Sequence, residues 1–201
     1  MHNLYLEKIE TPAFIWDEVS FWKNMKHIVR LGIGGHVNLV YPLKPFSILN
    51  CLKNFMSNLS GFSTSSVFEA RLAREIIGNG GSVHFTSPCL REDEVDEVIS
   101  LIDYISFNSM AQWERFRDLA IAKLSCALRV NPQLSFIKNN KYDPCRKHSK
   151  LGVPLRQLSA ILSNGSNILE GIKGIHFHTN CESTNFDHLL RTVKHIDTHI
   201  P

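Results

Sequence analysis

Short apolar runs and longer amphipathic segments alternate along the whole chain. The apolar runs predict strands at residues 36–44, 61–65, 82–86, 104–107, 123–130 and 172–179. Between and beyond them, apolar side chains recur at helical spacing, which predicts helices at residues 18–30, 46–59, 67–77, 92–102, 111–122, 154–162 and 186–196. Short apolar strands separated by helices are typical of parallel sheets that are buried on both faces.

This order of segments predicts an α/β fold, and it is compatible with a doubly wound sheet as well as with a barrel. About six βα units follow a first short apolar run at residues 13–16. A closed (β/α)8 barrel takes ~250 residues, which is more than the 201 residues of this chain. We therefore predict an incomplete (β/α)8 TIM-type barrel of about six βα units, with its C-terminal strands missing.

Composition and charge narrow the class of protein. The chain is 43% hydrophobic and 20% charged, as expected for one globular domain. No apolar run approaches the roughly 20 residues that span a bilayer, so we expect no membrane segment. The five cysteines are odd in number and scattered, which favours a reducing, cytoplasmic location over a disulfide framework.

Basic residues are concentrated in one stretch, residues 138–150. This stretch has no hydrophobic period, which predicts a solvated loop. Aromatic residues do not interleave with its charges, and the net charge of the chain is only +3. Nucleic-acid binding is therefore not expected.

Lys44 is the first candidate for chemistry, in the sequence Val-Tyr-Pro-Leu-Lys-Pro-Phe-Ser of residues 40–47. It follows a predicted strand, at the end where barrels keep their active sites. Its apolar neighbours Tyr41, Leu43 and Phe46 would disfavour the ammonium form and leave a nucleophilic amine of the Schiff-base type. The alternative is a lysine that extends outward from a strand end into solvent.

His176 and His178 form the second candidate site. Strand alternation places both imidazoles on one face, with Cys181 and Glu182 just beyond the predicted strand. Three interpretations stay open from the residue types alone. The imidazoles and thiol could bind zinc, one imidazole could stack on a flat cofactor, or both could be hydrogen-bonded in a barrel interior. His195 and His199, one helical turn apart, are expected at the surface.

Arg129 is the third candidate, near the end of an apolar strand. Burying its guanidinium is costly unless it meets an anion or an acceptor. A phosphate, a phenolate or a carboxylate suits its planar shape. The alternative is a structural ion pair with Glu69 or another acid.

Six motifs occur in an order and at a spacing that resemble one family. They are TPAFIWDE, YPLKPFS, GFSTSSVFEARLA, ALRVNP, KYDPC followed by SKLGVP, and GIHFHTNCE. The chain resembles the N-terminal part of the carboxynorspermidine (carboxyspermidine) decarboxylases. These belong to the pyridoxal-phosphate decarboxylases with an alanine-racemase-type barrel.

The resemblance implies pyridoxal 5'-phosphate as the cofactor and gives roles to residues at matching positions. Lys44 would bind the cofactor covalently, and His178 would stack on its ring. Glu69 would support that histidine, and Arg129 would lie near the ring. His176 and Cys181 would line the site without an assigned role, and no metal is implied.

The resemblance also implies an activity and partners. The family decarboxylates carboxynorspermidine or carboxyspermidine in polyamine biosynthesis, as a homodimer in which a β-domain follows the barrel. Residues 1–201 would form a partial barrel domain, with residues 1–17 contributing a strand to the absent β-domain. Activity would then need a complementing C-terminal fragment.

Two alternatives remain. One is a non-catalytic pyridoxal-phosphate carrier. The other is a metal-dependent barrel hydrolase that uses His176 and His178.

Overall fold

The computed structural model describes residues 9–31, 37–54, 59–137, 139–179, 181 and 185–200 of the chain. Its strands are β1 (Val40–Pro42), β2 (Gly61–Thr64), β3 (Ser82–Ser87), β4 (Tyr104–Phe107), β5 (Ser125–Asn131), β6 (Val153–Pro154) and β7 (Ile172–His176). Its helices are α1 (Glu18–Leu31), α2 (Leu49–Leu52), α3 (Val67–Ile77), α4 (Glu92–Leu101), α5 (Met110–Ile121), α6 (Leu155–Ser163) and α7 (Asp187–Asp197), with a 3₁₀ turn at Asn167–Leu169. No helix of the described part is long and apolar enough to cross a membrane.

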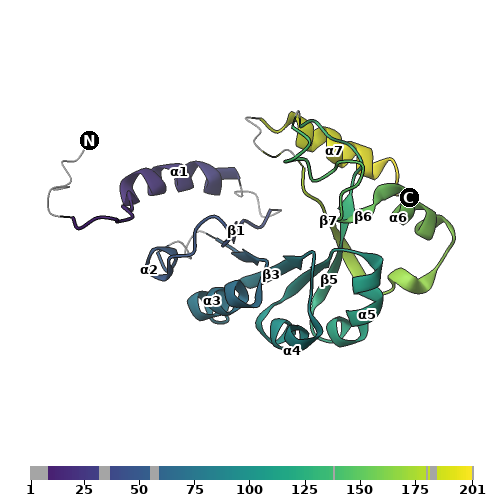
Figure 1. Ribbon diagram of the computed structural model, residues 1–201, viewed down its shortest axis with the longest axis horizontal. Helices are drawn as coiled ribbons and strands as arrows, with labels where there is room; N and C mark the ends of the chain where they lie inside the picture. The colour runs from purple at the N-terminus through teal and green to yellow at the C-terminus, as the bar shows by residue number, and fades with distance from the viewer. Residues whose placement is uncertain are drawn as a thin grey trace.

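All strand pairings in the described sheet are parallel. The order runs from β1 through β2, β3 and β4 to β5, which pairs with both β6 and β7. Strands β1, β2, β3, β4 and β7 are each followed directly by a helix, and α6 follows β5 after the short strand β6, which makes six βα units. Figure 1 shows helices α3, α4 and α5 along the same outer side of the curved sheet. The prediction of an incomplete barrel with about six units is confirmed.

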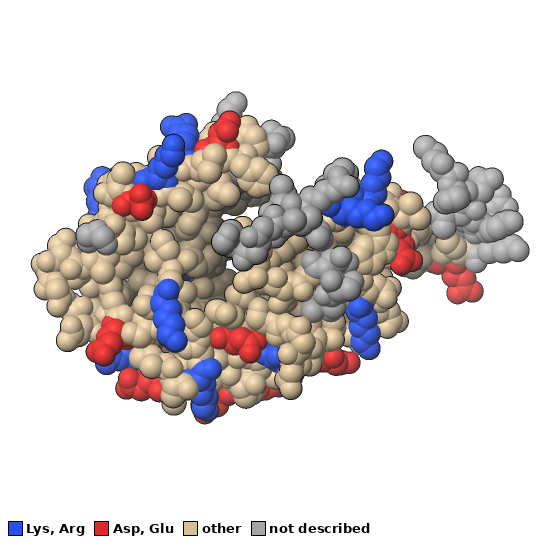
Figure 2. Space-filling view, turned by 180° about the vertical axis from the view of Figure 1, so that it is seen from behind, with Lys and Arg blue, Asp and Glu red and all other residues tan. Residues whose placement is uncertain are grey.

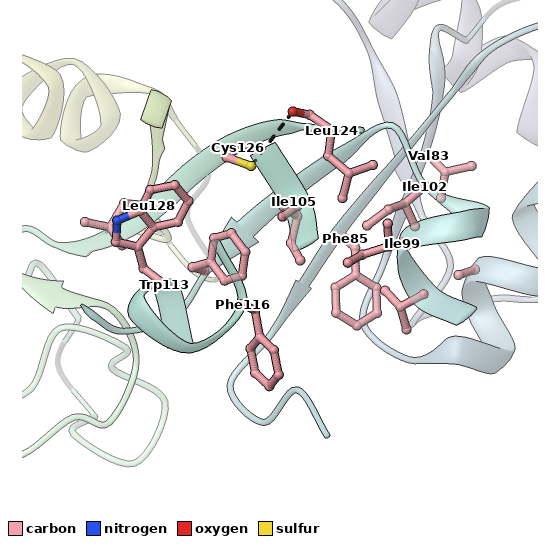
Figure 3. Close-up of a cluster of buried hydrophobic side chains, with 14 of the residues drawn as sticks. Val83, Phe85, Ile99, Ile102, Ile105, Trp113, Phe116, Leu124, Cys126 and Leu128 are labelled. Atoms are coloured by element: carbon pink, nitrogen blue, oxygen red, sulfur yellow. Dashed lines mark hydrogen bonds between the residues drawn. The ribbon is translucent and has the colours of Figure 1, made fainter. Parts of the chain in front are cut away.

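Alternation along the strands separates an apolar outer face from a polar inner face. In β3, Val83 and Phe85 are buried, whereas the intervening His84 is only half-buried. Figure 3 shows these two apolar side chains in one cluster with residues of α4 and α5, among them Ile99 and Trp113. The outer face of the sheet and the helices that cover it therefore form the hydrophobic core.

The turns before α3 and α5 are built in the same way. The Ser66 hydroxyl accepts a hydrogen bond from the Glu69 amide, and the Ser109 hydroxyl accepts one from the Gln112 amide. In return, the side chains of Glu69 and Gln112 each accept from the amide of the residue just before the capping serine. These reciprocal caps satisfy amides that the first helical turn leaves unpaired, and they fix how the chain leaves β2 and β4.

The first part of the chain differs most from the prediction. The strand predicted at 36–44 has only the three residues of β1, and the helix predicted at 46–59 only the four residues of α2, while residues 32–36 and 55–58 lie outside the described residues. Residues 9–17 contain no strand, and residues 1–8 are not described. A strand at residues 1–17 that joins a β-domain stays a prediction.

Gly61 begins β2 at a point where the backbone of β3 approaches closely. Its φ is 157°, and a Cβ here would lie 1.8 Å from the carbonyl oxygen of Ser82. We expect Gly61→Ala to lower the free energy of unfolding by more than about 3 kcal/mol, because the two strands would have to separate. Chemical denaturation followed by circular dichroism measures this change.

Gly165→Ala is the matched control for this substitution. Gly165 also has a positive φ, 64°, but a Cβ there would meet nothing within 4 Å. Its cost should stay near about 1 kcal/mol, the strain of the left-handed backbone alone. Equal losses for both variants would show that the contact between strands is not what demands glycine at position 61.

Candidate functional site

The candidate site lies at the carboxyl ends of the strands, beside a hollow of about 400 Å³. Polar side chains of the inner face line this hollow, among them Ser63, Thr86 and Ser106. Val40 of β1 and His176 of β7 line it as well, so the hollow reaches both edge strands of the sheet. Figure 2 shows the molecule hollowed near its centre, with most charged side chains toward the periphery.

Lys44 lies in a turn just beyond β1. The turn is held by two backbone hydrogen bonds: the Leu43 amide donates to the Ser63 carbonyl at 3.1 Å and the Phe46 amide to the Leu43 carbonyl at 3.2 Å. Leu43 is buried, but Lys44 itself is exposed, so the apolar enclosure expected from its neighbours is not formed. β1 ends at Pro42, and Pro45 follows Lys44, so the strand does not continue through the lysine.

Lys44 is nevertheless a neighbour of His178. His178 as a whole residue is exposed, yet three effects lower the pKa of its imidazole: first desolvation by the chain around it, then the charge of Arg129, and then the charge of Lys44. All three disfavour the imidazolium form. The charges of Lys44 and Arg129 thus both act on His178; Arg129 lies on β5, whereas Lys44 and His178 lie just beyond β1 and β7.

His176 and His178 contact each other edge to face, with ring centroids 4.7 Å apart and ring planes at 68°. Burial, His178 and Arg129 together lower the pKa of His176 to about 4, so this imidazole is neutral at pH 7. Its Nδ1 is buried without a hydrogen-bond partner, and no other side-chain nitrogen or oxygen of the described residues is in this state. An orphaned polar atom of this kind marks a place where a hydrogen-bonding group is still to be supplied.

Arg129 is the register partner of His176 across the β5–β7 pairing. Its side chain is buried, with only 7% of the residue exposed, and burial lowers the pKa of its guanidinium. Among the described residues it forms no ion pair, so the alternative of a structural pair with Glu69 is wrong. A buried guanidinium without a carboxylate is suited to an anionic oxygen of a ligand.

Glu69 has a local partner instead. Its carboxylate accepts hydrogen bonds from the Ser65 amide at 2.6 Å and the Ser65 hydroxyl at 3.0 Å. The hydrogen bonds among the described residues include none between Glu69 and His178. The support of His178 by Glu69 therefore stays a prediction. In the structure, the Glu69 carboxylate stabilises the turn between β2 and α3.

The loop that contains the basic stretch 138–150 is only partly solvated. Asp143 and Cys145 are buried, and the Cys145 thiol lies 3.5 Å from the carbonyl oxygen of His178. Burial, with the charge of Asp143, raises the pKa of this thiol to about 11, so it stays protonated and can donate to that carbonyl. The prediction of a solvated loop was based on the many charged residues of this stretch, and it missed these two buried positions.

Asn108, at the end of β4, anchors the same loop. Its side-chain amide donates to the Lys150 carbonyl at 2.9 Å and accepts from the Gly152 amide at 3.1 Å. Neither Asn108 nor Cys145 was predicted as a site residue. The KYDPC and SKLGVP motifs are the only sequence feature that indicated this loop.

Among the described residues, the remaining candidates do not assemble a metal site. Cys181 is exposed, and Glu182 lies outside the described residues. The described part of the chain contains no group of three or more histidine, cysteine or acidic side chains that could hold a metal ion. His195, expected at the surface, is half-buried and has its Nε2 3.1 Å from the Pro132 carbonyl oxygen.

Comparison with known proteins identifies the class to which this barrel belongs. Residues 20–200 match the family described as pyridoxal-dependent decarboxylase, pyridoxal binding domain. This match spans nearly all of the described structure. The chain belongs to the pyridoxal-dependent decarboxylase family, whose cofactor is pyridoxal phosphate.

Two curated relatives illustrate the similarity. The chain is 34% identical to the carboxyaminopropylagmatine decarboxylase of Synechocystis sp. over 190 residues, which are 94% of this chain and 46% of the relative. It is 32% identical to the carboxynorspermidine/carboxyspermidine decarboxylase of Campylobacter jejuni, over 90% of this chain and 45% of that protein. The chain thus spans about half the length of the curated relatives it matches.

Solved structures agree with the sequence comparison. The crystal structure of carboxynorspermidine decarboxylase from Campylobacter jejuni, complexed with norspermidine, superposes with a TM-score of 0.80 at 30% identity. The superposition covers 95% of this chain and 47% of that one. Diaminopimelate decarboxylase from Helicobacter pylori has the same fold, with a TM-score of 0.78 at 18% identity.

The depressed pKa of His176 makes stability depend on pH. An unfolded histidine takes up a proton near pH 6.5, whereas the folded one does so only near pH 4, so the free energy of unfolding falls as the pH drops between these values. We expect His176→Gln to reduce that fall by about 1–3 kcal/mol. Urea denaturation at pH 7 and pH 4 measures it.

His148→Gln, at an exposed position of the loop, is the matched control for removing a histidine. This control should lose as much stability as the parent protein between the two pH values. A His176→Gln variant that also keeps the full pH-dependent loss would contradict the burial of a neutral imidazole.

Proposed function

We propose that the chain forms the lysine-bearing part of an enzyme that decarboxylates carboxynorspermidine or carboxyspermidine with pyridoxal phosphate. The observation that carries the proposal is the match of residues 20–200 to a pyridoxal-binding domain, and the action of the Lys44 and Arg129 charges on His178 supports it. The relatives of about 30% identity and the norspermidine complex support the substrate class.

The side chains present fit the cofactor in kind. Lys44 offers an exposed amine that would hold the cofactor aldehyde covalently. The neutral, flat imidazole of His178 would lie on the ring without adding a charge to it. Arg129 would meet an anionic oxygen, and the unpaired Nδ1 of His176 indicates that the hydrogen bonding here is incomplete in the chain alone.

When bound, pyridoxal phosphate supplies an electron sink for the negative charge that loss of carbon dioxide leaves on an α-amino acid. The chain's own residues set the conditions for this chemistry. The Cys145 thiol donates to the carbonyl of His178 and helps to fix the position of that residue. Asn108 holds the loop that contains Cys145 against the strand ends.

The substrate of the whole enzyme is a polyamine derivative in this proposal, and a homodimer stays a prediction by resemblance. A second candidate substrate is carboxyaminopropylagmatine, since a relative named for it is 34% identical to this chain. Both candidates are α-amino acids with a long cationic arm. Turnover assays with each substrate, once the rest of the enzyme is supplied, distinguish them.

Lys44 gives the decisive test of the cofactor proposal. Incubation with pyridoxal phosphate followed by borohydride reduction should attach one pyridoxyl group to the chain, and peptide mapping should locate it at Lys44. We expect Lys44→Ala to lose at least about 90% of this labelling, because Lys44 is the lysine whose charge acts on His178.

Lys53→Ala is the matched control, since Lys53 is also an exposed lysine just after a short element, α2. This variant should be labelled as strongly as the parent chain. Labelling spread over many lysines, and unchanged by Lys44→Ala, would rule out the proposed cofactor site.

A further inference from the structure

The hollow beside the candidate site is bordered by one layer of small residues on the inner face of the sheet. Thr86, Ser106, Ala127 and Gly174 are register partners across β3, β4, β5 and β7, and the first three of them line the hollow. Interior layers of barrels are normally filled by bulky branched side chains. This layer instead leaves about 400 Å³, a volume typical of sites for small molecules.

Arg129 and His176 form the next layer toward the carboxyl ends of the strands. They are register partners, two residues beyond Ala127 and Gly174 on the same pair of strands. Arg129 is buried and has no carboxylate partner in the described part of the chain, and the buried Nδ1 of His176 lacks a hydrogen-bond partner. Two neighbouring polar groups in this state are suited to one shared acceptor atom of a ligand.

His84, a second imidazole that lines the hollow, differs from His176 in this respect. Its Nε2 lies 2.9 Å from the Ser82 hydroxyl, and its ring stacks on Tyr104 with the centroids 4.3 Å apart. Burial lowers the pKa of both histidines. A neutral imidazole is therefore common to both positions, whereas the missing partner belongs to His176.

The surroundings of the pair indicate which kind of oxygen it would bind. Arg129 and His176 lie on strands, whereas phosphate groups are commonly bound by the amides of a helix N-terminus. A carboxylate held by both groups would be stabilised before its loss, which would slow decarboxylation. A phenolate oxygen on a flat ring has a single negative charge, which matches one guanidinium and one neutral donor.

The angle between the two histidines of the site gives His176 a separate role from His178. Their ring planes are 68° apart, so a flat ring that lies parallel to His178 cannot stack on His176 as well. His176 would therefore contribute through its nitrogen. The contribution of His178 would come from its face.

We infer that the Nδ1–H of His176 and the guanidinium of Arg129 together bind the phenolic oxygen of the pyridoxal ring. His176 is thus a cofactor-binding residue, in the tautomer with its proton on Nδ1, and it fixes the rotation of the ring over His178. The inference rests on the proposed function, since that function supplies the cofactor.

Three probes separate the parts of the cofactor: pyridoxine 5'-phosphate, pyridoxine and inorganic phosphate. None of them has an aldehyde, so none can react with Lys44. Titration of the full chain, followed by NMR of its histidine nitrogens, gives the Kd of each probe. Pyridoxine 5'-phosphate and pyridoxine, which both have the phenolic hydroxyl, should shift the Nδ1 resonance of His176, and inorganic phosphate should leave it unchanged.

Two substitutions of His176 separate hydrogen bonding from packing. His176→Phe keeps a flat ring against His178 and removes the nitrogen, so it should raise the Kd of pyridoxine 5'-phosphate at least about tenfold, the effect of one hydrogen bond to an ionised group. His176→Asn loses the ring but keeps an N–H donor near the position of Nδ1, so it should raise this Kd less than His176→Phe does.

His84→Phe is the matched control, because it removes an imidazole of the same hollow that already has a partner. It should change the Kd of pyridoxine 5'-phosphate by less than about twofold, well under the effect of one hydrogen bond. The Kd of inorganic phosphate should stay unchanged in all three variants. Circular dichroism checks that each variant keeps its fold.

Gly174 gives an independent test that the ring occupies the hollow. A Cβ at this position would lie 3.9 Å from the Cβ of Ala127, an ordinary contact, so a side chain can be added here. Gly174→Val would fill part of the hollow and should raise the Kd of pyridoxine 5'-phosphate at least about tenfold. The Kd of inorganic phosphate should again stay unchanged.

Three outcomes would overturn the inference. They are a parent chain that does not bind pyridoxine 5'-phosphate, a His176→Phe variant that binds it better than His176→Asn does, and a shift of the His176 resonance by inorganic phosphate alone. The probes do not react with Lys44, so the proposed function can fail separately. Normal binding of pyridoxine 5'-phosphate without borohydride labelling at Lys44 would refute the covalent step and leave the assignment of His176 intact.

Discussion

Parallel strand pairing is the constraint on which the rest of the molecule depends. It brings the carboxyl ends of all the paired strands to one edge, so residues far apart in sequence meet there. Lys44 follows β1, Arg129 lies near the end of β5 and His178 follows β7. The ladder of backbone hydrogen bonds sets Arg129 opposite His176, and the packing of the outer face against the helices holds that ladder in place.

The positively charged groups of the site repel each other, and this repulsion opposes its assembly. Lys44, Arg129 and two imidazoles lie together, and no carboxylate of the described residues pairs with the guanidinium. The imidazoles resolve part of this repulsion by staying neutral, as the lowered pKa values of His176 and His178 show. Among the described residues the buried Arg129 charge has no carboxylate partner, at a cost of the order of a few kcal/mol, and an anionic ligand would offset it. The buried charge thus lowers the stability of the protein without a ligand, and the same charge makes the site suited to bind an anion.

Local rules determine the centre of the fold, which is why the sequence could predict it well. The spans of α3 and β4 agree with their predicted ranges, since capping serines, glycine stops and strict alternation mark their ends. Contacts between residues distant in sequence determine the parts of the fold that the sequence patterns did not predict. β1 spans only Val40–Pro42, with Lys44 exposed beyond it, and the two residues of β6 have no local pattern at all. The burial of Cys145 depends on the distant anchor Asn108, which no window of sequence around the loop contains.

The site is built on the least buried strands of the sheet. Lys44 follows β1 and His178 follows β7, and both of these are edge strands with exposed residues, whereas Arg129 belongs to the well-packed β5. An edge strand has half the backbone hydrogen bonds of a central one and opens at a lower free energy. A catalytic arrangement needs its groups held to within about 0.5 Å, which loosely held edges do not provide. Within the described sheet, the position of Arg129 is therefore fixed more firmly than the positions of Lys44 and His178.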